Sequence, residues 1–375
     1  MLGAAGATKL LLAEIRQQKL LWLLVFVPVV LVAERQTPDA HTALFVLSVF
    51  AIVPLAALLS HATEAVAART GDAAGGLLNA TLGNLTELVI AITALRAGQY
   101  MLVKASIAGA IVTNTLFMLG MSFLLGGLKH RVQEYNRANA RLHAGMLFLA
   151  TVALMAPSAL NAGDGGPGRE VTHQLSLGLS IMLMIGYGLG LAFSLKTHRD
   201  LFSSDESGHG EEAAWPIGLA LGTLAGVTLL VALVSEIFVA SVQEAAVTFG
   251  MTPAFVGFIV VSLVGAAAEM AAAFAAARKN RLDMSVGIAL GSSSQIALFV
   301  APALVLLSYA LGPSPMDLQL WPGAVVMTMI AALTAFLVTS TGRSAWFVGV
   351  LVLMVYMVFA MTLYLLPPAP VQGLP

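Results

Sequence analysis

The chain of 375 residues contains no cysteine and few charged residues. Without cysteine it has no disulfide framework, no thiolate metal site and no cysteine nucleophile. Charged residues make up 10% of the chain and hydrophobic residues 59%, whereas soluble domains average about 25% charged and about 45–50% apolar. Because a water-soluble core cannot bury so much apolar surface, the sequence predicts an all-α protein whose solvent is a lipid bilayer.

The apolar residues fall into segments of membrane-spanning length. A helix needs about 20 mostly apolar residues to cross a hydrocarbon core of roughly 30 Å. The sequence predicts eleven such segments, the first of which is short. They lie at 20–33, 43–66, 77–97, 104–127, 142–161, 174–195, 216–240, 253–277, 284–311, 319–339 and 345–366.

These segments predict two halves of five helices each, preceded by one extra helix. A polar stretch separates the halves, and five of its residues between Asp200 and Glu212 are acidic. It is interpreted either as a solvated linker or as a cation-attracting, regulatory element beside a pore. The predicted parts are an N-terminal segment with the first helix (1–42), helices 2–6 (43–195), the acidic cytoplasmic linker (196–215), helices 7–11 (216–366) and a C-terminal tail (367–375).

Basic residues divide unevenly between the two predicted sides of the membrane. With the N-terminus in the cytoplasm, 14 of the 18 Lys and Arg residues fall on the cytoplasmic side. The four on the other side are Arg35, Arg96, Lys104 and Arg169. Since cytoplasmic loops carry the excess of Lys and Arg, we expect a cytoplasmic N-terminus and an outside C-terminus.

The two halves share a pattern of residues. The segments beginning TLGNLTEL and LVGAAAEM align without a gap at an offset of 182 residues. Because each half has an odd number of helices, the two halves run in opposite directions. Inverted repeats with a site at the bilayer midplane are typical of secondary transporters. The aligned pairs are Gly83 with Gly265, Glu87 with Glu269, and Gly109 with Gly291.

Glu87 and Glu269 both fall near the middle of a predicted membrane helix. An ionised acid at the bilayer centre costs on the order of 3 kcal/mol, so such residues face a cavity or a partner. A protonated glutamate can instead hydrogen-bond between helices as a purely structural contact. A pair of glutamates at equivalent positions favours the functional interpretation.

Oxygen-bearing side chains surround both glutamates. Asn79, Gly83 and Glu87 are spaced by four residues, which would place them on one helix face. A set of oxygen ligands without nitrogen or sulfur suits Ca²⁺, Mg²⁺ or Mn²⁺, and the protonated acid, favoured by burial, would compete with the cation. The polar residues expected to support the site are Asn79, Asn84, Thr113, Asn114, Ser292 and Gln295.

Two stretches resemble a known family. The stretch GGLLNATLGNLTELVIAI at 75–92 is similar to the first signature of the cation/proton exchangers, in the calcium/cation antiporter superfamily, and the stretch 278–302 resembles the end of the second. The resemblance implies an eleven-helix Ca²⁺/H⁺ antiporter in which Glu87 and Glu269 are metal ligands and proton carriers. It also implies that acids of helices 2 and 7 guide the ion, which here are Glu64, Glu236 and Glu244.

The second signature departs from the family pattern at two positions. Ala266 stands where an asparagine follows the glycine, and Met270 where a histidine follows the glutamate. Alanine offers no side-chain ligand and methionine does not titrate. We therefore expect weaker or less selective Ca²⁺ binding than in a standard member.

Alternatives remain at this point. Proton-coupled exchange of Mn²⁺, Mg²⁺, Na⁺ or K⁺ is open, and a structural membrane protein or an intramembrane enzyme would be a different class. No nucleophile–base set converges at mid-membrane depth, which argues against an enzyme. The sequence predicts Ca²⁺ and H⁺ as partners in a bacterial-type inner membrane, with neither nucleic acid nor a cofactor.

Overall fold

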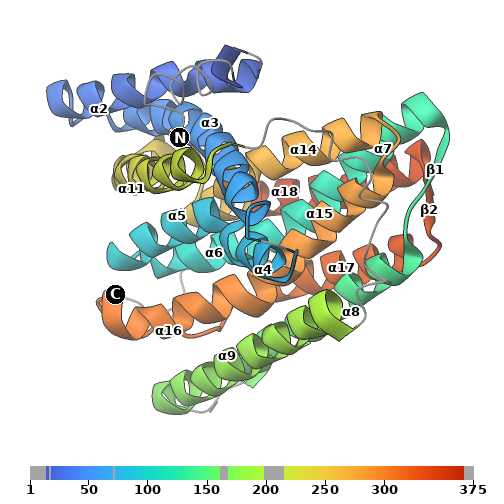
Figure 1. Cartoon of the computed structure of the whole chain (residues 1–375). Helices are drawn as coiled ribbons and strands as arrows, with labels where there is room; N and C mark the ends of the chain where they lie inside the picture. The colour runs from blue at the N-terminus through green and yellow to red at the C-terminus, as the bar shows by residue number, and fades with distance from the viewer. Residues whose placement is uncertain (1–13, 17, 71, 161–167, 198–214, 367–375) are drawn as a thin grey trace.

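The computed structural model describes residues 14–16, 18–70, 72–160, 168–197 and 215–366, and these are almost entirely helical (Figure 1). Within them, eight helices are long and apolar enough to cross a membrane. They are α3 (His41–Ala67), α6–η2–α7 (Tyr100–His130), α8 (Arg137–Leu160), α9–η3 (Glu170–Thr197), α11 (Ile217–Thr248), α15–η5–α16 (Leu282–Leu311), α17 (Pro322–Thr339) and α18 (Trp346–Leu365).

The remaining three predicted segments do not form single long α-helices. The predicted helix 253–277 begins with α12 (Pro253–Phe255) and η4 (Val256–Val261) and then bends by 58° between α13 (Ser262–Gly265) and α14 (Ala267–Arg278). The described residues thus contain eight candidate spans, or nine with this bent pair. The other two predicted segments correspond to α4 (Asp72–Leu82) with α5 (Leu85–Arg96), and to η1 (Lys19–Val25) with α2 (Phe26–Gln36).

The breaks in the two central segments occur at equivalent positions. The first lies at Asn84, with φ −97° and ψ 28°, and the second at Ala266, with φ −82° and ψ 6°. Each follows a glycine, the residue that least favours a helix interior apart from proline. The following helices also contain π-helical turns, η2 (Thr113–Met118) and η5 (Ile296–Val300), a feature frequent at functional sites.

Helices α3 and α11 pack along each other in opposite directions. His41 Nε2 lies 3.2 Å from a Glu244 carboxylate oxygen, and the rings of Phe45 and Phe238 stack 5.2 Å apart. As α3 advances from residue 41 to 45, the contacted residues of α11 therefore go backwards. The C-terminal ends of the two helices consequently lie at opposite ends of this pair.

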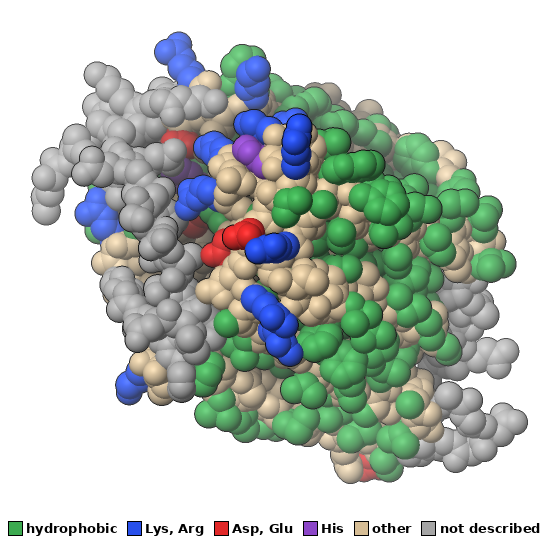
Figure 2. Space-filling view, turned by 90° about the vertical axis from the view of Figure 1, so that its right-hand side faces the viewer, with side chains coloured by type: hydrophobic (Ala, Val, Ile, Leu, Met, Phe, Trp, Pro, Cys, Tyr) green, Lys and Arg blue, Asp and Glu red, His purple; other side chains and the backbone are tan. Residues whose placement is uncertain are grey.

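A two-stranded ribbon closes one end of the molecule. Strand β1 (Val132–Glu134) follows α7 and pairs antiparallel with β2 (Arg343–Ala345), which precedes α18. Lys129 Nζ donates to the Arg278 carbonyl oxygen at 3.0 Å, which ties α7 to the end of α14. Figure 2 shows Lys and Arg side chains gathered on this face. The exposed basic residues at this end are Lys129, Arg131, Arg137, Arg141, Arg278, Lys279, Arg281 and Arg343.

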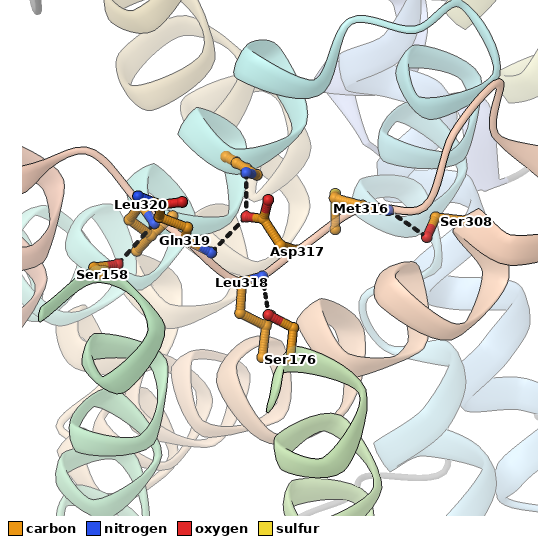
Figure 3. A network of polar contacts seen from close by, with 9 residues as sticks. Ser158, Ser176, Ser308, Met316, Asp317, Leu318, Gln319 and Leu320 are labelled. Atoms are coloured by element: carbon orange, nitrogen blue, oxygen red, sulfur yellow. Dashed lines mark hydrogen bonds and ion pairs between the residues drawn. The ribbon is translucent and has the colours of Figure 1, made fainter. Parts of the chain in front are cut away.

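An extended segment, residues 312–321 between α16 and α17, lies at the opposite end, and Figure 3 shows its polar contacts with the surrounding helices. Its alternate backbone N–H groups donate to serine hydroxyls of three helices, which satisfies donors that would otherwise be buried without partners. The bonds join Met316 to Ser308 at 2.7 Å, Leu318 to Ser176 at 3.0 Å and Leu320 to Ser158 at 2.9 Å. Asp317 of the same segment accepts from Lys104 Nζ at 2.5 Å.

Candidate cation site

Glu87 and Glu269 occupy the same local position in the two interrupted segments. Glu87 lies in the first turn of α5, directly after the break at Asn84, and Glu269 lies in the first turn of α14, directly after the break at Ala266. The first turn of a helix has backbone N–H groups without intrahelical partners and favours negative charge. The breaks therefore place both carboxylates where the backbone stabilises them.

The two glutamates lie close to each other across the halves. The Glu269 carboxyl is near enough to Glu87 for the two charges to repel, and it is also near the Ser292 hydroxyl. Gly265 leaves room for this approach, because a Cβ atom placed on it would stand 2.9 Å from Glu87 Cγ. The glycine before the second break thus makes room for the glutamate of the first half.

A chain of hydrogen bonds links three elements beside the glutamates. Asn114 Nδ2 of η2 donates to Ser292 Oγ at 3.0 Å. Ser292 Oγ donates to Asn84 Oδ1 at 2.8 Å, and Asn84 Nδ2 donates to Gln295 Oε1 at 2.6 Å. Asn84, Asn114 and Ser292 are buried, so the chain fixes the amide and hydroxyl groups in place.

Three oxygen atoms of this cluster have no partner. Glu87 Oε1, Glu269 Oε2 and Asn114 Oδ1 are shielded from solvent and accept no hydrogen bond from the part of the chain that the structure describes. A buried oxygen without a partner is costly. Ca²⁺ takes six to eight oxygen ligands from carboxylates, amide and backbone carbonyls and water. The chemistry of the cluster therefore fits part of such a ligand set, in which the two carboxylates would provide the charge.

Two of the predicted supporting residues do not join this cluster. Asn79 is exposed, and the break after Gly83 separates its helix from that of Glu87, so the shared helix face predicted from a continuous segment is wrong. Thr113 is buried, but its hydroxyl lies 3.5 Å from Tyr356 Oη of α18. The described structure brings together Asn84, Asn114, Ser292 and Gln295.

The three acids expected to guide the ion lie apart from each other. Glu64 is exposed near the C-terminal end of α3 and accepts from Ser60 Oγ at 3.3 Å. Glu244 contacts His41 at the other end of the α3–α11 pair. Glu236 lines a cavity together with Arg96. The sequence resemblance treats these acids as one group, whereas Glu64 lies at one end of the α3–α11 pair, and Glu236 and Glu244 both lie on α11 toward the other end.

Two further contacts beside the site were not predicted from the sequence. His143 Nδ1 of α8 lies 3.3 Å from Ser294 Oγ, so an imidazole packs on the helix that carries Ser292. Gly109 lies against η4, where a Cβ atom on it would stand 2.1 Å from the Phe258 carbonyl oxygen. The shared Gly109–Gly291 pattern does not single out the second contact, because a Cβ atom on Gly291 would meet no atom within 4 Å, and no sequence signal connects residue 143 with residue 294.

Comparison with known families gives a match over most of the chain. The profile of the family described as "Sodium/calcium exchanger protein" matches residues 40–196 and 219–365. The Ca(2+)/H(+) antiporter of Aphanothece halophytica is 38% identical over 365 residues, covering 94% of this chain and 97% of that protein. The Ca(2+)/H(+) antiporter ChaA of Bacillus subtilis is 37% identical, covering 86% and 92% of the two chains.

A solved structure shares the fold. The native structure of YfkE superposes with a TM-score of 0.79 at 34% identity, covering 92% of this chain and 98% of that one. These relatives confirm the resemblance found in the two signature stretches.

Proposed function

The chain belongs to the sodium/calcium exchanger family, and from this premise we propose that it is a secondary antiporter that exchanges Ca²⁺ for H⁺ across a membrane. The observation that carries the proposal is the pair of carboxylates of Glu87 and Glu269, each with a buried oxygen that has no partner among the described residues, beside a fixed set of amide and hydroxyl groups. Relatives with 37–38% identity are named Ca²⁺/H⁺ antiporters.

We further propose an inverted repeat of two five-helix halves and a total of eleven spans. The family profile matches the chain twice, once in each proposed half. The helix breaks at Asn84 and Ala266 lie 182 residues apart, which is the offset of the repeated sequence. The remaining two spans would be formed by α4 with α5 and by η1 with α2.

In the cation-loaded state, Glu87 and Glu269 are both ionised and hold Ca²⁺ between them. The charge of the cation offsets the repulsion of two neighbouring carboxylates, which otherwise favours protonation of one of them. Asn114 Oδ1 adds a neutral oxygen, because its amide nitrogen is already committed to Ser292. Backbone carbonyls at the breaks and water would complete the shell.

In the proton-loaded state, the same two carboxyl groups are neutral. A hydroxyl has one proton to donate and two lone pairs to accept with. Ser292 donates to Asn84 and accepts from Asn114, so one lone pair remains for a protonated Glu269. We propose that this bond orients Glu269 when it carries a proton. An ionised Glu269 would instead compete with Asn84 for the single Ser292 proton.

Ion selectivity depends on the second half of the site, which has fewer polar side chains than the first. Ala266 occupies the position equivalent to Asn84, and it is fully buried at the break. The polar chain around Asn84 therefore has no counterpart around Ala266. Fewer neutral ligands leave selection to the two carboxylates, which bind Mn²⁺ or Mg²⁺ as well as Ca²⁺.

We also propose the orientation predicted from the basic residues, in the inner membrane of a bacterial-type cell. Lys129, Arg131 and Arg343 lie at the ribbon end of the molecule together with Arg278 and Arg281. Lys104 lies near the other end of the span Tyr100–His130, beside the extended segment. This asymmetry supports a cytoplasmic ribbon end.

Transport in everted membrane vesicles tests this function. A pH gradient is established, one cation is added, and recovery of the quenched fluorescence of a pH-gradient dye is recorded for Ca²⁺, Mn²⁺, Mg²⁺, Na⁺ and K⁺. We expect the largest response with Ca²⁺ and none in vesicles without the protein. A response to Na⁺ or K⁺ alone would contradict Ca²⁺/H⁺ exchange while leaving the fold assignment intact.

A further inference from the structure

A cavity of about 280 Å³ lies between the C-terminal end of α5 and the C-terminal half of α11. Thr93, Arg96 and Gln99 line one wall, and Glu236 and Val239 line the other. In Figure 1, α5, α6 and α11 lie on the side of the molecule away from the ribbon. Helix α5 also carries Glu87, but in its first turn, whereas the cavity is lined from its last turn.

The depth of the cavity follows from the helix ends that form it. Helix α5 ends at Arg96, the chain turns at Gly98 with φ +72°, and the span Tyr100–His130 starts one residue after Gln99. The first residues of a membrane-spanning helix lie at the boundary between lipid tails and head groups. The cavity therefore opens at the level of the phospholipid head groups.

The walls of the cavity are held at a fixed separation. Gln99 Nε2 donates to the Val239 carbonyl oxygen at 3.0 Å, which joins the start of α6 to α11. The backbone N–H of Gln99 donates to the Ala94 carbonyl at 2.9 Å and caps the end of α5. The Gln99 side chain thus joins the two walls to each other, and Arg96 and Glu236 take no part in that contact.

The two charged residues of the cavity are of opposite sign and remain apart. Arg96 and Glu236 are both exposed, and neither has an ion-pair partner within 4.0 Å among the described residues. A free cation would be attracted by Glu236 but repelled by Arg96. A free anion would be attracted by Arg96 but repelled by Glu236. A ligand that satisfies both walls must carry a negative and a positive group a few ångströms apart.

We propose that this cavity binds a phosphoethanolamine group, supplied by an aminophospholipid of the surrounding membrane. The guanidinium of Arg96 matches the geometry of a phosphate and binds it with charge-assisted hydrogen bonds. The Glu236 carboxylate accepts from the primary ammonium group. Glu236 then serves as a head-group acceptor, in place of the ion-guiding role that the sequence resemblance implies. This proposal does not depend on the transported ion.

Lipid retention by the full-length protein tests the proposal. The protein is reconstituted in nanodiscs of phosphatidylcholine and phosphatidylglycerol, with or without phosphatidylethanolamine at constant total charge. Lipid that remains after detergent extraction is identified by native mass spectrometry, and thermal unfolding is recorded in parallel. We expect phosphatidylethanolamine to be retained and to raise the melting temperature. In Arg96→Gln and Glu236→Gln its retention should fall roughly tenfold, because each loses a charge-assisted hydrogen bond.

The control variants are Arg343→Gln and Glu134→Gln, which change an exposed pair 3.1 Å apart at the other end of the molecule. They should retain phosphatidylethanolamine like the wild type. Stabilisation by free phosphoethanolamine in detergent would support the head-group chemistry without the lipid tails. Equal retention of N-methylated lipid, of phosphatidylcholine or of phosphatidylglycerol would overturn the proposal, since these lipids lack the primary ammonium group. Unchanged retention in both cavity variants would overturn it as well.

Discussion

Gly265 of the second half lies directly against Glu87 of the first, with only 2.9 Å between Glu87 Cγ and the place that a Cβ atom on Gly265 would occupy. A Cβ atom on its counterpart Gly83 would instead stand 3.7 Å from Gln295 Oε1. The two halves therefore meet through unequal contacts. Glu87 is held by packing against the second break, whereas the first break is held by the polar chain from Asn84 to Gln295.

Removing either central carboxylate should abolish exchange. Glu87→Gln and Glu269→Gln keep the size of each side chain but remove its charge and its proton-binding site, so neither Ca²⁺ nor H⁺ can be loaded normally. We expect loss of the Ca²⁺-induced fluorescence response in vesicles that contain wild-type amounts of each variant. Melting temperatures should stay the same or rise, because a neutral amide is cheaper to bury than a carboxylate.

The matched control is Glu134→Gln, an equal chemical change at an exposed position. It should transport like the wild type. Exchange retained in either central variant would contradict the proposed site, even if the protein still proves to be a Ca²⁺/H⁺ antiporter.

Competition between protons and Ca²⁺ should appear as a pH dependence of apparent affinity. Protons and the cation occupy the same two carboxyl groups, so lowering the pH on the side where Ca²⁺ binds should raise the KM for Ca²⁺. Raising the pH there should lower it, until both groups are ionised. Initial rates of ⁴⁵Ca²⁺ uptake in vesicles at fixed membrane potential measure this dependence. A KM that is independent of pH would show that the ions use separate groups.

Ser292→Ala should alter this pH dependence more than it alters folding. The substitution removes the acceptor proposed for protonated Glu269 and the donor to Asn84 Oδ1. Loss of one hydrogen bond of this kind costs about 1 kcal/mol, or roughly fivefold in affinity. We expect Ca²⁺ to compete better at low pH, because the bonds of Ser292 to Asn84 and Asn114 are lost in both states, whereas the bond to Glu269 is lost in the protonated state alone. Ser293→Ala is the control, since that hydroxyl bonds to the Ala289 carbonyl of its own helix at 2.7 Å.

The polar side chains of the first half of the site can be introduced at the equivalent positions of the second half. At the offset of 182 residues, Asn84 corresponds to Ala266 and Ser292 corresponds to Ala110. The double variant Ala266→Asn with Ala110→Ser should recreate an amide held by a hydroxyl and lower the KM for Ca²⁺ by roughly fivefold to tenfold. Ala266→Asn alone should gain less, because Ala266 is fully buried and the new amide lacks its partner. Unchanged Ca²⁺ affinity in the double variant would show that the residue at position 266 does not determine the affinity of the site.

The sequence predicted the central carboxylates because their chemistry is unusual for a membrane helix. It also predicted Asn84, Asn114, Ser292 and Gln295, which the hydrogen bonds join. It failed for Asn79 because residue spacing assumes an unbroken helix, and the turn at Asn84 rotates one part of the segment relative to the other.

Contacts between segments far apart in the sequence could not be predicted from residue spacing. The serines that hold residues 316–320 come from α8, α9 and α16, and each looks in sequence like any small residue of an apolar helix. The ribbon of β1 and β2 joins strands of three residues each, too short for an alternating pattern to be recognised.

The Lys104–Asp317 ion pair should contribute strongly to stability. Its side chains are only 8% and 18% exposed, with Nζ and Oδ1 2.5 Å apart. Removing one partner of a buried pair leaves an uncompensated charge and costs about 3–5 kcal/mol. We expect Lys104→Met and Asp317→Asn each to lower the melting temperature in detergent. The double variant Lys104→Met with Asp317→Leu should be more stable than either single variant. Equal loss in all three would show that the pair acts through its shape rather than its charges.

The two equivalent glycines of the repeat should respond in opposite ways to the same substitution. A Cβ atom on Gly109 would stand 2.1 Å from the Phe258 carbonyl oxygen and 2.4 Å from Ser262 Oγ, whereas one on Gly291 would meet no atom within 4 Å. Gly109→Ala must push α6 away from η4, and overpacking of this kind costs about 1–3 kcal/mol. Gly291→Ala adds a better helix former and should stabilise by up to about 1 kcal/mol. Thermal unfolding of the purified variants in one detergent decides this, since a similar loss of stability in both would mean that Gly291 also contacts a neighbouring helix.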